Sequence, residues 1–113
     1  MDVIEIDKKI VPIRFGMNAL RLFCKDQNIK LTELSRLGNN IGLDEACSLI
    51  LCGLKDGARK NKTNINLTVD DVADALDEDF TILEKAMEIF ANSFNTAIKG
   101  NKVEEKKKSL KKK

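Results

Sequence analysis

The residue types that most often carry catalysis or bind metals are scarce in this chain, which has three cysteines and no histidine. Without histidine, the commonest general base and the histidine-containing catalytic triads are excluded. The separation between Cys47 and Cys52 matches neither a CxxC pair nor the usual zinc-ligand spacings. An odd number of cysteines cannot all pair within one chain. We therefore expect Cys24, Cys47 and Cys52 to be small buried side chains in a reducing compartment.

Carboxylates are the remaining candidates for chemistry, and they concentrate between Asp70 and Asp79, where six of ten residues are acidic. The segment lacks the central glycine of an EF-hand calcium loop. No partner group is available to shift the pKa values of these carboxyls, and the chain has no glycine-rich phosphate loop. We interpret the acids as a solvated face and as helix caps. The sequence therefore predicts a protein that works by binding, with no enzymatic activity, cofactor or metal.

The charges are divided unevenly along the chain. Residues 1–98 hold 12 Lys and Arg against 16 Asp and Glu, a net charge of −4, whereas residues 99–113 hold 8 Lys against 2 Glu, a net charge of +6. Such asymmetry is typical of a disordered extension. We expect residues 1–100 to form one globular domain and residues 101–113 a disordered, Lys-rich tail. The chain begins without the basic and apolar blocks of a signal peptide, which predicts a cytoplasmic protein.

One helix is expected to lie at the centre of the domain, because Leu43 to Ala58 is the most apolar stretch of the sequence. Its apolar residues occupy almost the whole circumference of a helix with 3.6 residues per turn, as in a buried element. The stretch is too short for a bilayer, which needs about 20 apolar residues. Gly53 and Gly57 fit three interpretations: close packing of a neighbouring element, approach of another subunit, or an end of the helix at Gly57.

The N-terminal segment from Val3 to Phe15 alternates between apolar and polar residues, with a polar break at residues 7–9. This pattern predicts a β-hairpin whose turn type stays open. Pro12 has no backbone N–H, so its strand is expected to lie at an edge or to contain a bulge.

Three shorter helices are predicted beside the central one. The expected ranges are residues 17–27, 31–37 and 68–76. Thr32 is a candidate N-cap for the second helix, and Gly38 is expected to stop it. Thr68 and Asp71 have the spacing of a capping box at the start of the third, where Leu67 and Val72 form a hydrophobic staple. The residues expected to face inward on this helix are Val69, Val72, Ala73 and Leu76.

The last predicted helix runs from Phe80 to Lys99 and ends at Gly100. Its main apolar stripe consists of Phe80, Leu83, Met87, Phe90, Phe94 and Ile98. The stripe is wider than a small domain easily covers, so Met87, Phe90 and Phe94 are candidates for a partner-binding patch. The alternative is that they belong to the core. The expected fold is α+β and mainly α, with an N-terminal hairpin, about five helices around the central helix, and a disordered tail.

Three sequence stretches, taken in this order, resemble a known family. They are FGMNALRLF (Phe15–Phe23), LDEACSLILCGLKDGA (Leu43–Ala58) and LTVDDVADALD (Leu67–Asp77). Together with the hairpin before them and the helix after them, over roughly residues 3–99, they resemble the small tail assembly chaperones of long-tailed bacteriophages and prophages.

The resemblance implies a non-virion protein of the bacterial cytoplasm. Such chaperones bind the tape measure protein, keep its apolar helices soluble, and help recruit tail tube subunits. The resemblance also implies a small α+β fold and leaves homo-oligomerisation open. A longer product made by ribosomal frameshifting is common in the family, and the A-rich codons of the lysine runs would suit a slip site.

The main alternative is a small nucleic-acid-binding module that acts through the basic tail. The negative charge of residues 1–98 and the acids between Asp70 and Asp79 oppose this interpretation, because phosphates would be repelled. The tail also lacks aromatic residues between its lysines. Nucleic acid is therefore not expected as a partner, and neither is a membrane.

Overall fold

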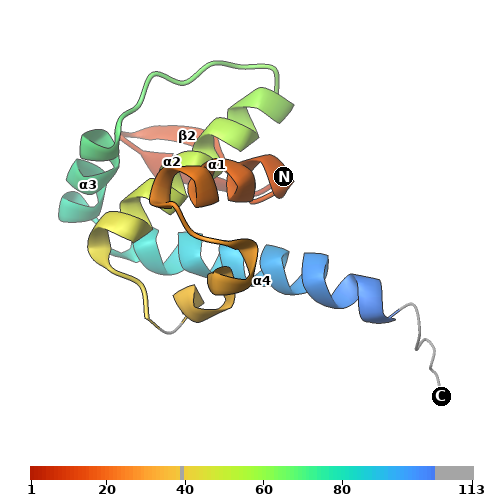
Figure 1. Ribbon diagram of the computed structural model, residues 1–113. Coiled ribbons are helices and arrows are strands. Elements are labelled where there is room, and N and C mark those ends of the chain that lie inside the picture. The colour runs from red at the N-terminus through yellow and green to blue at the C-terminus, as the bar shows by residue number, and fades with distance from the viewer. Residues whose placement is uncertain (39, 104–113) are drawn as a thin grey trace.

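The computed structural model describes residues 1–38 and 40–103 (Figure 1). In chain order its elements are β1 (Val3–Ile6), β2 (Lys9–Pro12), α1 (Met17–Gln27), the 3-10 helix η1 (Leu31–Gly38), α2 (Leu43–Lys60), α3 (Val69–Glu78) and α4 (Thr81–Val103). The predicted class is confirmed: an N-terminal hairpin precedes five helices within the described residues, and the fold is α+β with mainly helical content.

The hairpin pairs β1 and β2 antiparallel, with Ile4 opposite Val11. Its two turn residues, Asp7 and Lys8, have φ angles of 55° and 64°. Positive φ at both central positions is the property of a type I′ turn, whose twist matches that of the flanking strands. Pro12 ends β2 in a two-stranded sheet. Because both strands are edges, the proline is accommodated without a bulge.

Helix α2 lies at the centre of the fold, as predicted, and contacts α1, α3, α4 and β2 (Figure 1). Twelve of its 18 residues are buried. It continues to Lys60, two residues beyond the predicted end, with exposed basic side chains in its last turn, where they complement the helix dipole. Among residues 1–38 and 40–103, no helix has both the length and the apolarity needed to cross a membrane.

The two glycines of α2 allow close internal packing. A Cβ atom built on Gly57 would lie 2.6 Å from the carbonyl oxygen of Pro12, and one built on Gly53 would lie 2.6 Å from the ring of Phe15. Such distances are not tolerated, so these positions bring the hairpin and the following connection directly against the helix. Gly57 lies inside α2 and does not end it.

The predicted helix starts are partly right. The capping box of α3 is confirmed: the Asp71 N–H donates to Thr68 Oγ1 at 3.2 Å, and the Thr68 N–H donates to Asp71 Oδ2 at 2.9 Å. Thr32 is not the N-cap of η1, because the helix already begins at Leu31. On α3 the buried residues are Val72, Ala75 and Leu76, so the prediction that Ala73 faces inward was wrong.

Helix α4 begins and ends later than predicted. Phe80 lies before the helix and is 59% exposed. The Asp79 carboxylate accepts the Thr81 N–H at 3.1 Å, which favours a helix start at Thr81. The helix passes through Gly100 and ends at Val103. The prediction that it ends at Gly100 was therefore wrong, and so was the prediction that residues 101–103 belong to a disordered tail. The rest of that tail prediction concerns residues 104–113, which lie outside the described residues.

Candidate functional site

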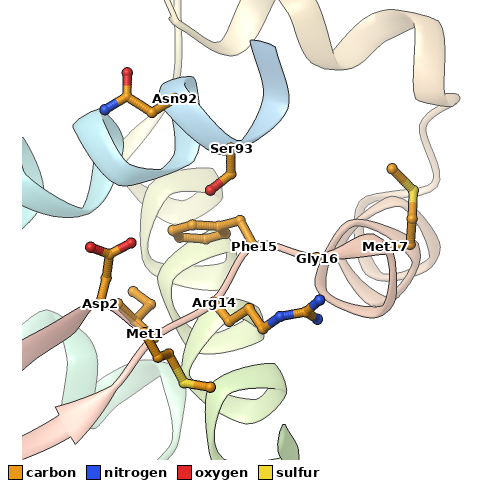
Figure 2. Close-up of a pocket in the computed structure, with 9 residues that line it drawn as sticks. Met1, Asp2, Arg14, Phe15, Gly16, Met17, Asn92 and Ser93 are labelled. Atoms are coloured by element: carbon orange, nitrogen blue, oxygen red, sulfur yellow. The ribbon is translucent and has the colours of Figure 1, made fainter. Parts of the chain in front are cut away.

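A groove of about 590 Å³ separates the start of the chain, the β2–α1 connection and α4 (Figure 2). We call it the hairpin–α4 groove. It is lined by Met1, Asp2, Ile13, Arg14, Phe15, Gly16, Met17, Asn92 and Ser93. Figure 2 shows Phe15 between the α4 residues on one side and Arg14 on the other. The lining is therefore an apolar base with polar groups around it.

Aromatic packing fixes the base of the groove. The rings of Phe15 and Phe90 meet edge to face, with centroids 5.5 Å apart and an interplanar angle of 81°. Phe90 in turn stacks on Phe94, with centroids 5.7 Å apart. Contacts of this kind add to the stabilisation from burial and hold the rings in a defined orientation. The Phe15 connection is thus attached to α4 by side-chain packing.

The three candidate partner residues of α4 differ in exposure. Phe90 is 2% exposed and belongs to the hydrophobic core. Met87 and Phe94 are half-buried at the edge of that core. Only Met87 and Phe94 of this set therefore present surface to a partner, and Phe90 supports them from beneath.

Asp56 holds the β2–α1 connection onto α2. Its side chain is fully buried, and its carboxylate accepts three hydrogen bonds. Arg14 Nη1 donates to it at 3.0 Å, Arg59 Nη2 at 2.8 Å and the Gly16 N–H at 3.1 Å. A buried carboxylate is stable when charged donors satisfy its oxygens in this way. Asp56 consequently sets the position of the residues on either side of Phe15.

Backbone hydrogen bonds complete the support. The Arg14 N–H donates to the Gly53 carbonyl oxygen at 3.0 Å, and the Ile13 N–H donates to the Asp2 carbonyl oxygen at 3.0 Å. The first bond requires the close approach that Gly53 allows, and the second ties the start of the chain to the connection. These bonds fix two walls of the groove to the central helix.

The arrangement is suited to binding an apolar group. Met1 and Met17 offer flexible thioether side chains at the rim, and such side chains adapt to varied apolar shapes. Asp2, Asn92 and Ser93 can satisfy polar groups of a ligand at the margin. Over the described ranges 1–38 and 40–103, no three His, Cys, Asp or Glu side chains are placed to hold a metal ion.

The three cysteines lie outside the groove and are not joined in disulfides. Cys47 and Cys52 are buried, as predicted, and Cys24 is half-buried. Burial raises the pKa of the Cys52 thiol to about 11, with a further contribution from the Asp26 carboxylate. Burial also raises the pKa values of Cys24 and Cys47. Since the thiolate is the reactive form, these side chains are poor nucleophiles near neutral pH.

We expect iodoacetamide at mildly basic pH to modify the native protein slowly, and to modify Cys24 before the other two cysteines. At pH 8, a thiol with a pKa of about 11 is ionised in roughly one molecule in a thousand. Peptide mass spectrometry against time measures each site, and the same reaction in urea provides the fully accessible rate. Modification of Cys52 at the urea rate in native protein would contradict its burial.

Two features of the structure were missed by sequence reasoning. Asp56 was not singled out, although an acid in the most apolar stretch of the chain signals a buried partner. Leu43 was predicted to belong to the buried central helix and Phe80 to the apolar stripe of the last helix, yet they are 63% and 59% exposed. Helical spacing predicts which residues share a face of a helix. It does not predict whether a neighbouring element covers that face at the start of the helix.

Comparison with protein-family models, curated proteins and solved structures finds no match for this chain.

Proposed function

We propose that the chain is a non-enzymatic tail assembly chaperone of a long-tailed bacteriophage or prophage, acting in the host cytoplasm. In this role it binds the tape measure protein, keeps its apolar helices soluble, and helps recruit tail tube subunits. The observation that carries the proposal is the hairpin–α4 groove, with its aromatic base and methionine rim. The resemblance over residues 3–99 supplies the identity of the partner.

The chemistry of the groove suits the apolar face of an amphipathic helix. Helices bind in apolar grooves by inserting a few large side chains from one face, while their polar face stays in water. Met1 and Met17, which are 67% and 57% exposed, provide the apolar contacts, and Phe15, which is 5% exposed, supports the groove from beneath. Asn92 and Ser93 lie at the polar margin. Methionine at the rim accommodates successive, non-identical turns of a long partner helix. Met87 and Phe94 are half-buried side chains of α4, the helix that also carries Asn92 and Ser93. They form a second apolar surface beside the groove.

The electrostatics also favour a protein partner over nucleic acid. Asp70, Asp74 and Asp77 are exposed on α3. These carboxylates create a negative potential that would repel phosphates. They leave the association of apolar helices largely unaffected.

The test is co-expression with the tape measure protein of the same phage or prophage genome. We expect Met17→Glu to reduce the amount of co-purified tape measure protein about tenfold, because the complex would bury an unpaired charge. Met17 is exposed at the first position of α1, where a carboxylate suits the helix dipole, so folding is retained.

Leu31→Glu is the matched control. Leu31 is also an exposed apolar residue at the first position of a helix, but it does not line the groove. Phe94→Glu tests the second surface separately, with a thermal melt to establish that the variant is folded. The proposal is overturned if folded Met17→Glu and Phe94→Glu variants retain as much partner as the control.

A further inference from the structure

A second hollow, independent of the groove, lies where α2 begins and where α3 meets α4. Its volume is about 510 Å³. We call it the acidic hollow, and it is lined by Leu43, Ala73, Asp74, Leu76, Asp77 and Phe80. Leu76 is buried at its base, and the flanking Leu43 and Phe80 are largely exposed. Two large apolar side chains are therefore left without a partner at this place.

The rim of the hollow is negatively charged. Asp74 and Asp77 line it, and the chain has six acids and no Lys or Arg between residues 69 and 80. The ion pairs formed within the described residues involve Asp56 and Glu45, and none involves a carboxylate of α3. A ligand with one large apolar side chain between cationic groups would match both the apolar base and the acidic rim.

The chain itself contains a segment of this chemistry. Residues 104–113 read EEKKKSLKKK, in which Leu110 stands between two runs of three lysines. These runs give the segment the opposite charge to the hollow. Leu110 is the only apolar residue of the segment, so it is the side chain that would fill the hollow.

The length of α4 decides which copy of the chain supplies this segment. Phe80 immediately precedes the helix, and α4 has 23 residues, so its far end lies about 34 Å away. Figure 1 shows α3 and the C-terminal end of α4 on opposite sides of the molecule. The seven residues from 104 to 110 span at most about 25 Å when fully extended, and reversing direction shortens that reach. Leu110 therefore cannot reach the hollow of its own molecule.

We propose that the segment around Leu110 of one molecule binds in the acidic hollow of a second copy. Leu110 contacts Leu43, Leu76 and Phe80, and the lysines on either side pair with Asp74 and Asp77. The two surfaces in this contact are different, so the contact is heterologous and the pair of molecules retains one free hollow and one free segment. Association is head to tail, and repetition gives a ring or an open chain.

Sedimentation of the full chain over a range of concentrations tests the proposal. We expect self-association at low ionic strength that weakens strongly at about 0.5 M salt, where the Debye length is only about 4 Å. Leu110→Ser is expected to weaken association roughly ten- to a hundredfold, as the loss of one buried leucine does. Phe80→Ser should have a similar effect, and its exposed position preserves folding.

Charge exchange provides the decisive measurement. The double variant Asp74→Lys/Asp77→Lys and the double variant Lys111→Glu/Lys112→Glu should each lose association alone. Their mixture should recover it, because the glutamates introduced beside Leu110 in one then face the lysines introduced at the rim of the hollow in the other. Asp70→Lys/Glu78→Lys is the matched control, since it changes the same net charge on α3 outside the lining of the hollow.

The proposal is overturned by any of three results. The chain could be monomeric at low ionic strength and high concentration. Association could persist unchanged in Leu110→Ser and Phe80→Ser. The mixed charge variants could fail to recover association while the control variant still associates. None of these results depends on binding to a tape measure protein.

Discussion

Replacing Asp56 with alanine is expected to lower the free energy of unfolding by about 3 kcal/mol, because a satisfied buried carboxylate is removed. The substitution leaves the Gly16 N–H, which donates to Asp56 Oδ2 at 3.1 Å, without its partner. It also leaves two arginines without the group that holds them, and a space at a fully buried position. The measurement is urea unfolding followed by circular dichroism.

Two variants separate the contributions of charge and shape. Asp56→Asn keeps an acceptor for the Gly16 N–H and fills nearly the same volume, so we expect a smaller loss than with alanine. Arg14→Gln removes a guanidinium that is 40% exposed, and exposed ion pairs contribute about 0–1 kcal/mol. If Asp56→Ala were no more damaging than Arg14→Gln, the carboxylate would not be the anchor of the connection.

The same residue links stability to the proposed binding function. Asp56 holds the Gly16 backbone and the Arg14 side chain, on either side of Phe15, and Phe15 forms the base of the hairpin–α4 groove. The carboxylate does not line the groove itself. Its loss therefore changes the groove by displacing the connection, and a binding defect in Asp56→Ala should accompany a change in stability. A groove residue such as Met17 should instead change binding alone.

Local sequence patterns predicted the elements well because each pattern reports interactions close along the chain. The capping box of Thr68 and Asp71 spans one helical turn, and both of its hydrogen bonds are present. The apolar circumference of residues 43–58 identified the central helix. The end of α4 was misplaced at Gly100 because glycine is only mildly unfavourable inside a helix and need not stop it.

The candidate site could not be predicted in the same way. The groove combines residues 1–2, 13–17 and 92–93, which no local period connects. The helical stripe on α4 identified Met87, Phe90 and Phe94 as one face, but their exposure depends on which neighbours cover that face. Phe90 is buried partly by Phe15, a residue 75 positions away. Long-range packing of this kind is fixed by the tertiary fold.

Gly57→Ala is expected to destabilise the protein by about 2–3 kcal/mol, although alanine raises helix propensity by about 1 kcal/mol. The new Cβ would lie 2.6 Å from the Pro12 carbonyl oxygen and 2.9 Å from the Ile13 backbone nitrogen. Both obstacles are backbone atoms, so the hairpin itself would have to move away from α2. Urea unfolding of the variant and of the wild type measures the difference.

Gly53→Ala is the matched comparison on the same helix, because its Cβ would meet side chains of Phe15 and Ile13 instead of backbone. Phe15→Leu removes the ring atoms that the new Cβ would meet. It should therefore recover part of the stability lost in Gly53→Ala, after allowance for the effect of Phe15→Leu alone. No substitution of a side chain should recover the stability lost in Gly57→Ala. A Gly57→Ala protein as stable as the wild type would contradict the close contact between α2 and β2, because the helix could then accept a methyl group where the hairpin lies.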